Sequence, residues 1–186
     1  KNDKNKKYID DMLYLLGKIQ EEKLDFESAS KTYHKLSSLY PKHPKAQYSY
    51  SRSEFLAYNE DDLNLALKSN KGLCSTLQDD QERSKCCVRQ LYYKKILSSS
   101  IRLKRKSLIN SFNKCIDRKK TKLNKIYLGV FIAYYRDLFP TNKQFIKSLD
   151  STISQINHYS KNKKNKIENK EFKKILSFLY QKKAES

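Results

Sequence analysis

Apolar residues recur every three to four positions along most of this chain, which is the period of an amphipathic α-helix. Only three Gly and three Pro interrupt the 186 residues, and this scarcity of turn residues favours an all-α fold. The pattern predicts helices over residues 8–22, 26–39, 45–58, 61–73, 82–98 (with Val88, Leu91 and Tyr92 inward), 104–118 and 123–139, then a helix presenting Phe145, Leu149, Ile153 and Ile156, and a closing helix presenting Phe172, Ile175, Leu176 and Leu179.

Helix ends are marked by a few residues. Proline lacks an amide donor and disfavours helical geometry in the residue before it, so we expect helices to end before Pro41 and at Pro140. Thr141 is expected to cap the following helix, because its hydroxyl can accept hydrogen bonds from the amides of the first turn. The polar segments 1–7 and 160–170 are predicted to lack regular structure.

The first two predicted helices carry small residues where a pair of helices would touch. Gly17 and Ala29 allow the two backbones to approach closely, and the bulky residues around this crossing are Leu13, Leu16, Tyr33 and Leu36. One such hairpin cannot bury its own apolar face, so neighbouring helices are expected to stack on it.

A weaker copy of this pattern follows, with Tyr50, Ala57 and Ala66 in matching places and polar turn residues at 59–62. The copy differs at the crossing itself: the residues that replace Leu16, Gly17 and Tyr33 of the first hairpin are Ser53, Glu54 and Asn70.

These spacings resemble the tetratricopeptide (TPR) repeat superfamily over Asp10 to Leu77. With Asp10 as position 1 of a 34-residue frame, the expected residues stand at positions 4, 7, 8, 20, 24, 27 and 32, namely Leu13, Leu16, Gly17, Ala29, Tyr33, Leu36 and Pro41. The resemblance implies stacked antiparallel helical hairpins, a TPR-like α-solenoid, with additional C-terminal helices. The alternative is an ordinary helical hairpin with Gly, Ala and Pro in the same register.

In TPR arrays the first helix of each hairpin lines a concave surface. Position by position, the resemblance selects as partner-binding residues Tyr14, Lys18, Glu22, Tyr48, Ser51, Phe55, Tyr58 and Asn59. Their aromatic rings suit an extended or helical peptide with apolar side chains. Lys18 is the only obvious member of a carboxylate clamp, which argues against recognition of an acidic chain terminus. The alternative is that these rings pack against other helices of the same chain.

The four cysteines, Cys74, Cys86, Cys87 and Cys115, are disulfide candidates. A Cys74–Cys86 bridge would close a short loop in an oxidising compartment, and four reduced, partly buried thiols are the alternative. A zinc site is disfavoured, because adjacent cysteines do not easily bind one tetrahedral ion and no histidine lies within the cluster.

The run GLCSTLQDDQERSKCCVRQLYYKKI at residues 72–96 resembles the junction of TPR co-chaperones of the endoplasmic reticulum lumen that end in a J domain. The resemblance implies that Cys74 is bonded to Cys86 or Cys87, that the groove binds unfolded chains, and that the protein resides in a secretory or other extracytoplasmic compartment. The intervening segment is two residues longer here, the second cysteine is doubled, and no His-Pro-Asp motif is present.

The net charge of +20 is unevenly distributed. Residues 1–81 hold 13 basic and 13 acidic side chains, residues 82–125 hold 15 and 2, and residues 126–186 hold 12 and 5. We therefore expect two TPR-like hairpins over 8–77 and a basic helical region over 82–183, packed together as one continuous α domain. Its possible phosphate or RNA contacts are Arg102, Lys104, Arg105 and Lys106, and the commoner alternative is a solvated lysine-rich helix face.

Catalysis and membrane insertion have little support in the sequence. The three histidines are scattered, His43 is expected to face solvent in a turn, and no catalytic residue, metal or cofactor is predicted. The longest apolar run, 126–135, is too short for a membrane span. We expect a non-enzymatic protein-binding module, in particular a chaperone or co-chaperone. One alternative is an RNA- or ribosome-associated basic protein. Another is a bacterial envelope-assembly TPR scaffold, because the turn at 40–46 resembles the turns in the repeats of bacterial TPR lipoproteins.

Overall fold

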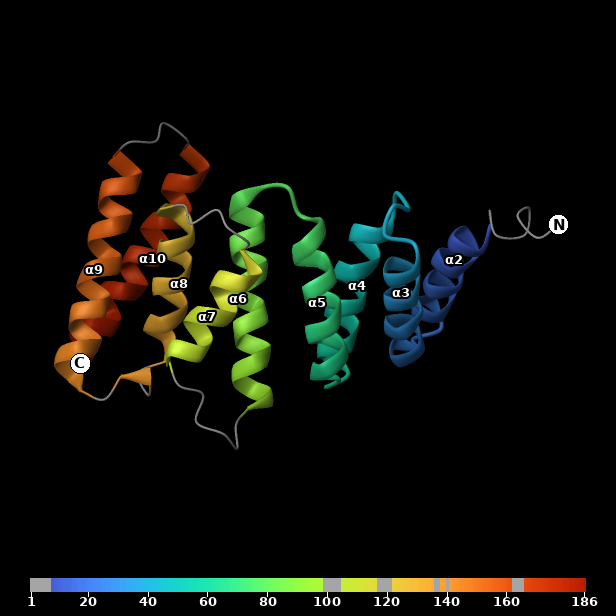
Figure 1. The fold of residues 1–186 in the computed structure, drawn as a ribbon, viewed down its shortest axis with the longest axis horizontal. Helices are drawn as coiled ribbons and strands as arrows, with labels where there is room; N and C mark the ends of the chain where they lie inside the picture. Colours follow the sequence, from blue (N-terminus) through green and yellow to red (C-terminus); the bar gives the residue numbers. More distant parts are fainter. Residues whose placement is uncertain (1–7, 99–104, 117–121, 136–137, 140, 162–165) are drawn as a thin grey trace. The chain divides into compact units, whose positions relative to one another are not determined.

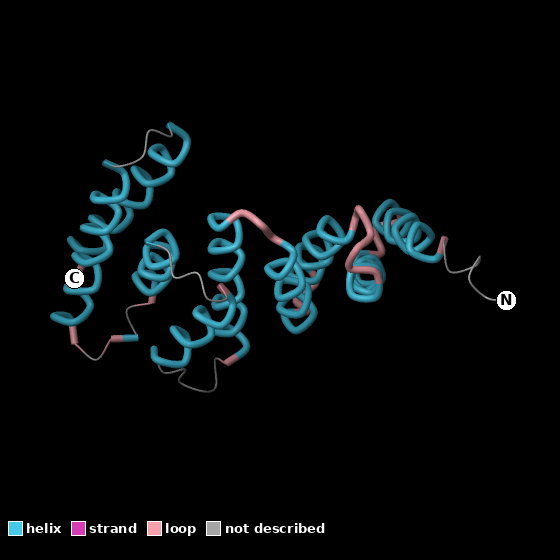
Figure 2. The backbone as a smooth tube through the Cα atoms, turned by 45° about the horizontal axis from the view of Figure 1, so that its top comes forward, coloured by secondary structure: helices cyan, strands magenta, loops and turns pink. Residues whose placement is uncertain are grey.

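The computed structural model describes residues 8–98, 105–116, 122–135, 138–139, 141–161 and 166–186. The regular secondary structure in these residues is helical, without any strand, as Figure 2 shows. The predicted all-α class is therefore confirmed. The chain forms two compact units, Lys1–Ile101 and Arg102–Ser186. The first unit holds α2 (Ile9–Glu22), α3 (Phe26–Leu39), α4 (Ala46–Asn59), α5 (Leu63–Thr76) and α6 (Asp80–Leu97). The structure thus groups α6 with the hairpins, whereas the sequence pattern placed it at the start of the basic region.

In the first unit each helix packs against the next one in the chain (Figure 1). The α2–α3 and α4–α5 hairpins are equivalent residue by residue. All four helices have 14 residues, and each hairpin turn contains one residue at a φ of 59°, Leu24 and Asp61 respectively. In each hairpin the next residue, an aspartate, caps the second helix: Asp25 accepts from the Ser28 amide at 3.1 Å and Asp62 from the Leu65 amide at 2.9 Å.

The crossing of α2 and α3 is tight, and Tyr33 lies against Gly17, as expected for one of the bulky residues around this crossing. A Cβ added at Gly17 would lie 2.8 Å from Cε1 of Tyr33, so the space left by the missing side chain is filled by the Tyr33 ring. Ala29 is fully buried and belongs to the same cluster as Tyr33 and Leu56. The expectation that Leu16 fills this crossing was wrong, because its side chain is 45% exposed.

The mismatched residues of the second hairpin form a polar counterpart of the same crossing. Glu54 and Asn70 occupy the places of Gly17 and Tyr33, and the Asn70 amide donates to Oε1 of Glu54 at 3.1 Å. Both side chains are buried. A hydrogen-bonded pair therefore takes the place of an aromatic ring lying over a glycine.

The second unit comprises α7 (Arg105–Cys115), α8 (Lys122–Tyr134), α9 (Asn142–Lys161) and α10 (Lys166–Ala184), of which α8, α9 and α10 pack against one another. Thr141 caps α9 as predicted, with its hydroxyl 3.3 Å from the Gln144 amide. The prediction for 160–170 was wrong in part, because α9 continues to Lys161 and α10 begins at Lys166. The segment before Pro140 also differs: α8 ends at Tyr134, and the Tyr135 amide bonds to the Ile132 carbonyl three residues back.

Candidate protein-binding surface

Aromatic side chains form an exposed stripe along α4. Tyr48, Phe55 and Tyr58 are 42%, 53% and 40% exposed, and their spacing of seven and three residues places them on one side of the helix. Large apolar groups gathered on a surface mark interaction sites. The predicted alternative, in which these rings are buried by other helices of the chain, does not hold for these three side chains within the described residues.

Neighbouring helices extend the stripe at both ends. Tyr14 of α2 lies with its ring centroid 6.0 Å from that of Tyr48, in an edge-on arrangement. At the other end the ring centroids of Tyr58 and Tyr92 of α6 are 6.4 Å apart, and their hydroxyl oxygens are 3.2 Å apart. We call this set, Tyr14, Tyr48, Phe55, Tyr58 and Tyr92, the aromatic surface. The pattern had placed Tyr92 inward, but Tyr93 is the buried ring of the pair.

A carboxylate beneath the aromatic surface ties three helices together. Glu21 of α2 accepts a hydrogen bond from the Tyr33 hydroxyl of α3 at 2.7 Å and from Nε of Arg52 of α4 at 2.6 Å. Burial acts to raise the pKa of Glu21, but the hydrogen bonds from Arg52 and Tyr33 lower it below its ordinary value. The Arg52 guanidinium also lies 5.1 Å from the ring centroid of Phe55, so the same contact orients an exposed ring.

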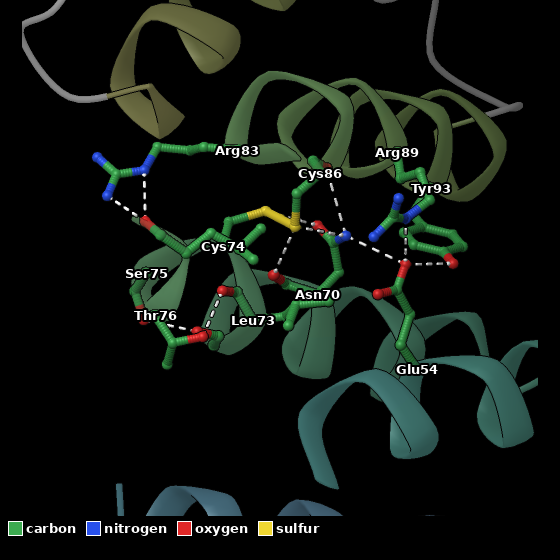
Figure 3. Close-up of a disulfide and its surroundings, with 12 residues drawn as sticks. Glu54, Asn70, Leu73, Cys74, Ser75, Thr76, Arg83, Cys86, Arg89 and Tyr93 are labelled. Atoms are coloured by element: carbon green, nitrogen blue, oxygen red, sulfur yellow. Dashed lines mark hydrogen bonds and ion pairs between the residues drawn. A yellow bond between two sulfur atoms is a disulfide. The ribbon is translucent and has the colours of Figure 1, made fainter. Parts of the chain in front are cut away.

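A second carboxylate repeats this arrangement one hairpin further on. Oε1 of Glu54 accepts from Nε of Arg89 at 2.9 Å and from the Tyr93 hydroxyl at 3.0 Å, both on α6, in addition to Asn70 of α5 (Figure 3). Burial and the neighbouring Glu54 charge raise the pKa of Tyr93, which therefore stays protonated and able to donate. Glu21 and Glu54 each join groups from two neighbouring helices and support the two ends of the aromatic surface.

A disulfide connects the same region covalently. Cys74 of α5 is bonded to Cys86 of α6, with the two Cα atoms 5.6 Å apart, and this is one of the pairings that the sequence suggested. The Asn70 amide that binds Glu54 also lies 3.3 Å from the Cys86 carbonyl oxygen, as Figure 3 shows. No cysteine in the described part of the chain is free. The bridge and the Glu54 hydrogen bonds therefore hold α6 against α5 together.

A buried polar chain links α3, α4 and α5. The Ser53 hydroxyl donates to the Ser30 carbonyl at 2.7 Å and accepts from the Ser69 hydroxyl at 2.8 Å, which leaves Ser69 to accept from Nδ1 of His34 at 3.0 Å. Burial and the nearby charge of Lys68 lower the pKa of His34, so the neutral ring is its stable form near neutral pH.

The polar residues predicted for partner binding differ in exposure. Lys18 is half-buried and acts electrostatically on Glu21, while Glu22, Ser51 and Asn59 are exposed. The prediction omitted Arg52 and Tyr92. A cation three residues before Phe55 on the same helix was the available signal for Arg52, whereas Tyr92 had been assigned to another module.

The four basic residues predicted for phosphate contact are only partly covered by the structure. Arg102 and Lys104 lie outside the described residues, and Arg105 begins α7. Lys106 lines an open hollow of about 420 Å³ together with Ser107, Asn110, Ser111 and Lys114.

His43 differs from its expected solvent-facing position. Its side chain is only 7% exposed, its Nδ1 accepts from the Lys45 amide at 3.1 Å, and its Nε2 lies 3.1 Å from Oδ1 of Asp11. His43 therefore fastens the turn between the hairpins to the start of α2.

In comparisons with known proteins, no family model, curated protein or solved structure matches the chain. Among the described helices, none combines the length and the hydropathy that crossing a bilayer requires. The fold and the site therefore define an all-helical protein with an exposed aromatic surface, and function has to be argued from that surface.

Proposed function

We propose that this chain is a non-catalytic protein-binding module of TPR type, whose aromatic surface binds an apolar segment of a partner or client protein. One observation carries the proposal: Tyr48, Phe55, Tyr58 and Tyr92 are exposed, and half-buried Tyr14 packs edge-on against Tyr48. The ion pairs of Glu21 with Arg52 and of Glu54 with Arg89 lie at the two ends of this set. The equivalence of the two hairpins, down to their caps and left-handed turn residues, supports the TPR assignment.

The chemistry of the surface suits apolar peptide recognition. Aromatic rings provide large contact areas with few rotatable bonds, so little conformational entropy is lost on binding. The tyrosine hydroxyls and Arg52 offer hydrogen bonds to a peptide backbone, which are independent of the peptide sequence. Such a surface binds many apolar segments with modest selectivity, as a chaperone must.

The oxidised cysteines support the secretory version of this proposal. Disulfides persist in oxidising compartments, and Cys74–Cys86 lies next to the hydrogen bonds that support one end of the aromatic surface. We propose that the protein assists unfolded chains in such a compartment.

The test uses a reduced, unfolded model client labelled with a fluorophore, titrated with the whole chain. Replacing Tyr48→Ala and Phe55→Ala together should weaken binding by roughly tenfold or more, because truncating exposed aromatic anchors removes much of the binding energy. The matched control is Tyr134→Ala with Tyr180→Ala, two tyrosines of the second unit that are 60% and 53% exposed, and it should bind as the unaltered chain does. Equal affinity of the Tyr48/Phe55 variant, with unchanged circular dichroism, would contradict the proposal.

A further inference from the structure

A hollow of about 440 Å³ lies in the second unit and is lined by side chains of α7, α8 and α9. Two of its lining residues, Gly129 and Thr152, meet where α8 and α9 cross, and a Cβ added at Gly129 would collide with the Thr152 side chain. Beside this crossing α9 contributes Ser148 and Ser151, whose small side chains leave the space open. We call this space the α8–α9 hollow. Its volume is in the range of pockets that bind small ligands.

Apolar side chains form much of the lining. Ile109 of α7 and Leu128 and Ile132 of α8 belong to it. A smaller hollow of about 200 Å³ shares Leu128 with it and adds Phe112 of α7. The lining of the two hollows runs along α8 from Ile132 back to Asn124, which is about 12 Å of helix. An extended hydrocarbon chain could therefore cover apolar side chains over this whole length.

The charges around the α8–α9 hollow have one sign. Lys125 of α8 and Lys147 of α9 line it, both are exposed, and neither has an ion pair with a described residue. The helices α7, α8 and α9 carry three, two and three basic residues, and their one acidic residue, Asp150, accepts from Lys183 at 2.7 Å. A cleft with charges of one sign and apolar walls concentrates ions of the opposite sign.

The two lysines lie at opposite ends of the apolar lining. α8 and α9 run antiparallel side by side, as Figure 1 shows, so the end of α8 lies beside the start of α9. Lys147 is therefore close to Ile132, and Lys125 is at the end that the smaller hollow shares. The start of α9 also carries the positive end of its helix dipole. An anionic group is best placed at Lys147, because a chain attached to it can then cover the apolar lining of both hollows.

A hydrocarbon chain with one anionic end uses both parts of this lining. A small anion would contact Lys147 but leave Leu128 and Ile132 in water, and an uncharged hydrocarbon would gain nothing from the lysine. One turn from Lys147, the Ser151 hydroxyl accepts from Gln155 at 3.3 Å and keeps its own proton free to donate. A protein helix would occupy about 1,000 Å³ over the same length, which is more than the two hollows hold.

We propose that the α8–α9 hollow binds a free long-chain fatty acid. Lys147 binds the carboxylate, the chain lies against Ile132 and Leu128 and continues towards Phe112, and Lys125 adds to the positive potential. This site belongs to the second unit, whereas the aromatic surface belongs to the first, so the proposal does not depend on the proposed protein-binding function.

The test is calorimetric titration of the whole chain with dodecanoate below its micelle concentration. Lys147→Met should weaken binding by at least about tenfold, because a hydrogen bond to a charged group contributes at least that much. Ser151→Phe should weaken it as strongly by filling the hollow. Dodecanol, which lacks the charge, and butanoate, which lacks the chain, should each bind at least about tenfold more weakly than dodecanoate. Both altered side chains are exposed or half-exposed at the surface, so circular dichroism should be unchanged.

Matched controls separate this site from general attraction to a basic protein. Lys173→Met and Ser177→Phe make the same changes at exposed positions of α10 that line neither hollow, and both variants should bind dodecanoate as the unaltered chain does. Unchanged affinity in both Lys147→Met and Ser151→Phe would overturn the proposal. Equal weakening by Lys147→Met and Lys173→Met would also overturn it, as would loss of binding in the Tyr48→Ala/Phe55→Ala variant, since the amphiphile would then bind elsewhere.

Discussion

Replacing Gly17 by Ala tests the packing of the first hairpin, because the two effects of this substitution have opposite signs. In an ordinary exposed helix the change would add about 1 kcal/mol of stability, since alanine has the higher helix propensity. Here the new methyl carbon would lie 2.8, 2.9 and 3.0 Å from three atoms of the Tyr33 ring. Contacts that short require the ring to move.

Tyr33 has little freedom to move. Its side chain is fully buried, its hydroxyl donates to Glu21, and its ring centroid lies 6.3 Å from that of Tyr14 and 6.2 Å from that of Tyr48. Overpacking a close-packed interior costs about 1 to 3 kcal/mol. After the propensity gain is subtracted, we expect Gly17→Ala to lower the free energy of unfolding by about 1 kcal/mol.

Urea unfolding followed by circular dichroism measures this free energy, and a double-mutant cycle isolates its cause. In a Tyr33→Leu background the added methyl no longer meets a ring, so Gly17→Ala should become neutral or stabilising, with a coupling energy of about 1 to 2 kcal/mol. A Gly17→Ala variant that is more stable than the unaltered chain would refute the packing described here.

Three further predictions concern single features of the first unit. Removing the disulfide with Cys74→Ser and Cys86→Ser should cost about 3 kcal/mol in urea unfolding, as expected for a bridge across a sequence separation of 12, and the folded parent chain should show no thiol that reacts with Ellman's reagent. Leu24→Asn should raise the free energy of unfolding by about 1 kcal/mol, because Leu24 is exposed at a φ of 59°, a conformation that asparagine tolerates better; no gain would mean that this turn is not left-handed. The pKa of His34 is lowered in the folded protein, so the unfolded chain takes up a proton first as the pH falls below about 6.5. Stability is therefore lost from that pH down to the folded-state pKa of His34. His34→Gln should flatten this decline in urea midpoints measured from about pH 7.5 to about pH 5.

Much of the local structure could be predicted from the sequence. The α3 bounds were expected at 26–39, and Thr141 was expected to cap α9, because caps and turn residues act through neighbouring backbone groups. The end of α8 was not predicted, since its apolar pattern continues beyond Tyr134 while the backbone changes to a tighter turn.

The tertiary details were harder to predict, because they depend on residues far apart in the sequence. Glu54 and Asn70 looked like departures from the hairpin pattern. Only their hydrogen bond shows that, as a pair, they take the places that Gly17 and Tyr33 hold in the first hairpin. The sequence did place Tyr33 at the crossing of the first hairpin, but it did not show that the ring lies directly against Gly17. Of the candidate binding residues, the exposed rings of α4 followed from the resemblance to the TPR frame, while Tyr92 required the contacts between helices.

The paired carboxylates have a consequence for how the first unit melts. A 14-residue helix is marginal in water by itself, so its persistence depends on its neighbours. Glu21 bonds to groups of α3 and α4, and Glu54 to groups of α5 and α6, so separation of either neighbouring helix would break part of the hydrogen bonding of a largely buried carboxylate. Partial fraying is thereby penalised at both ends, and α2 to α6 should lose structure in a single cooperative transition rather than one hairpin at a time.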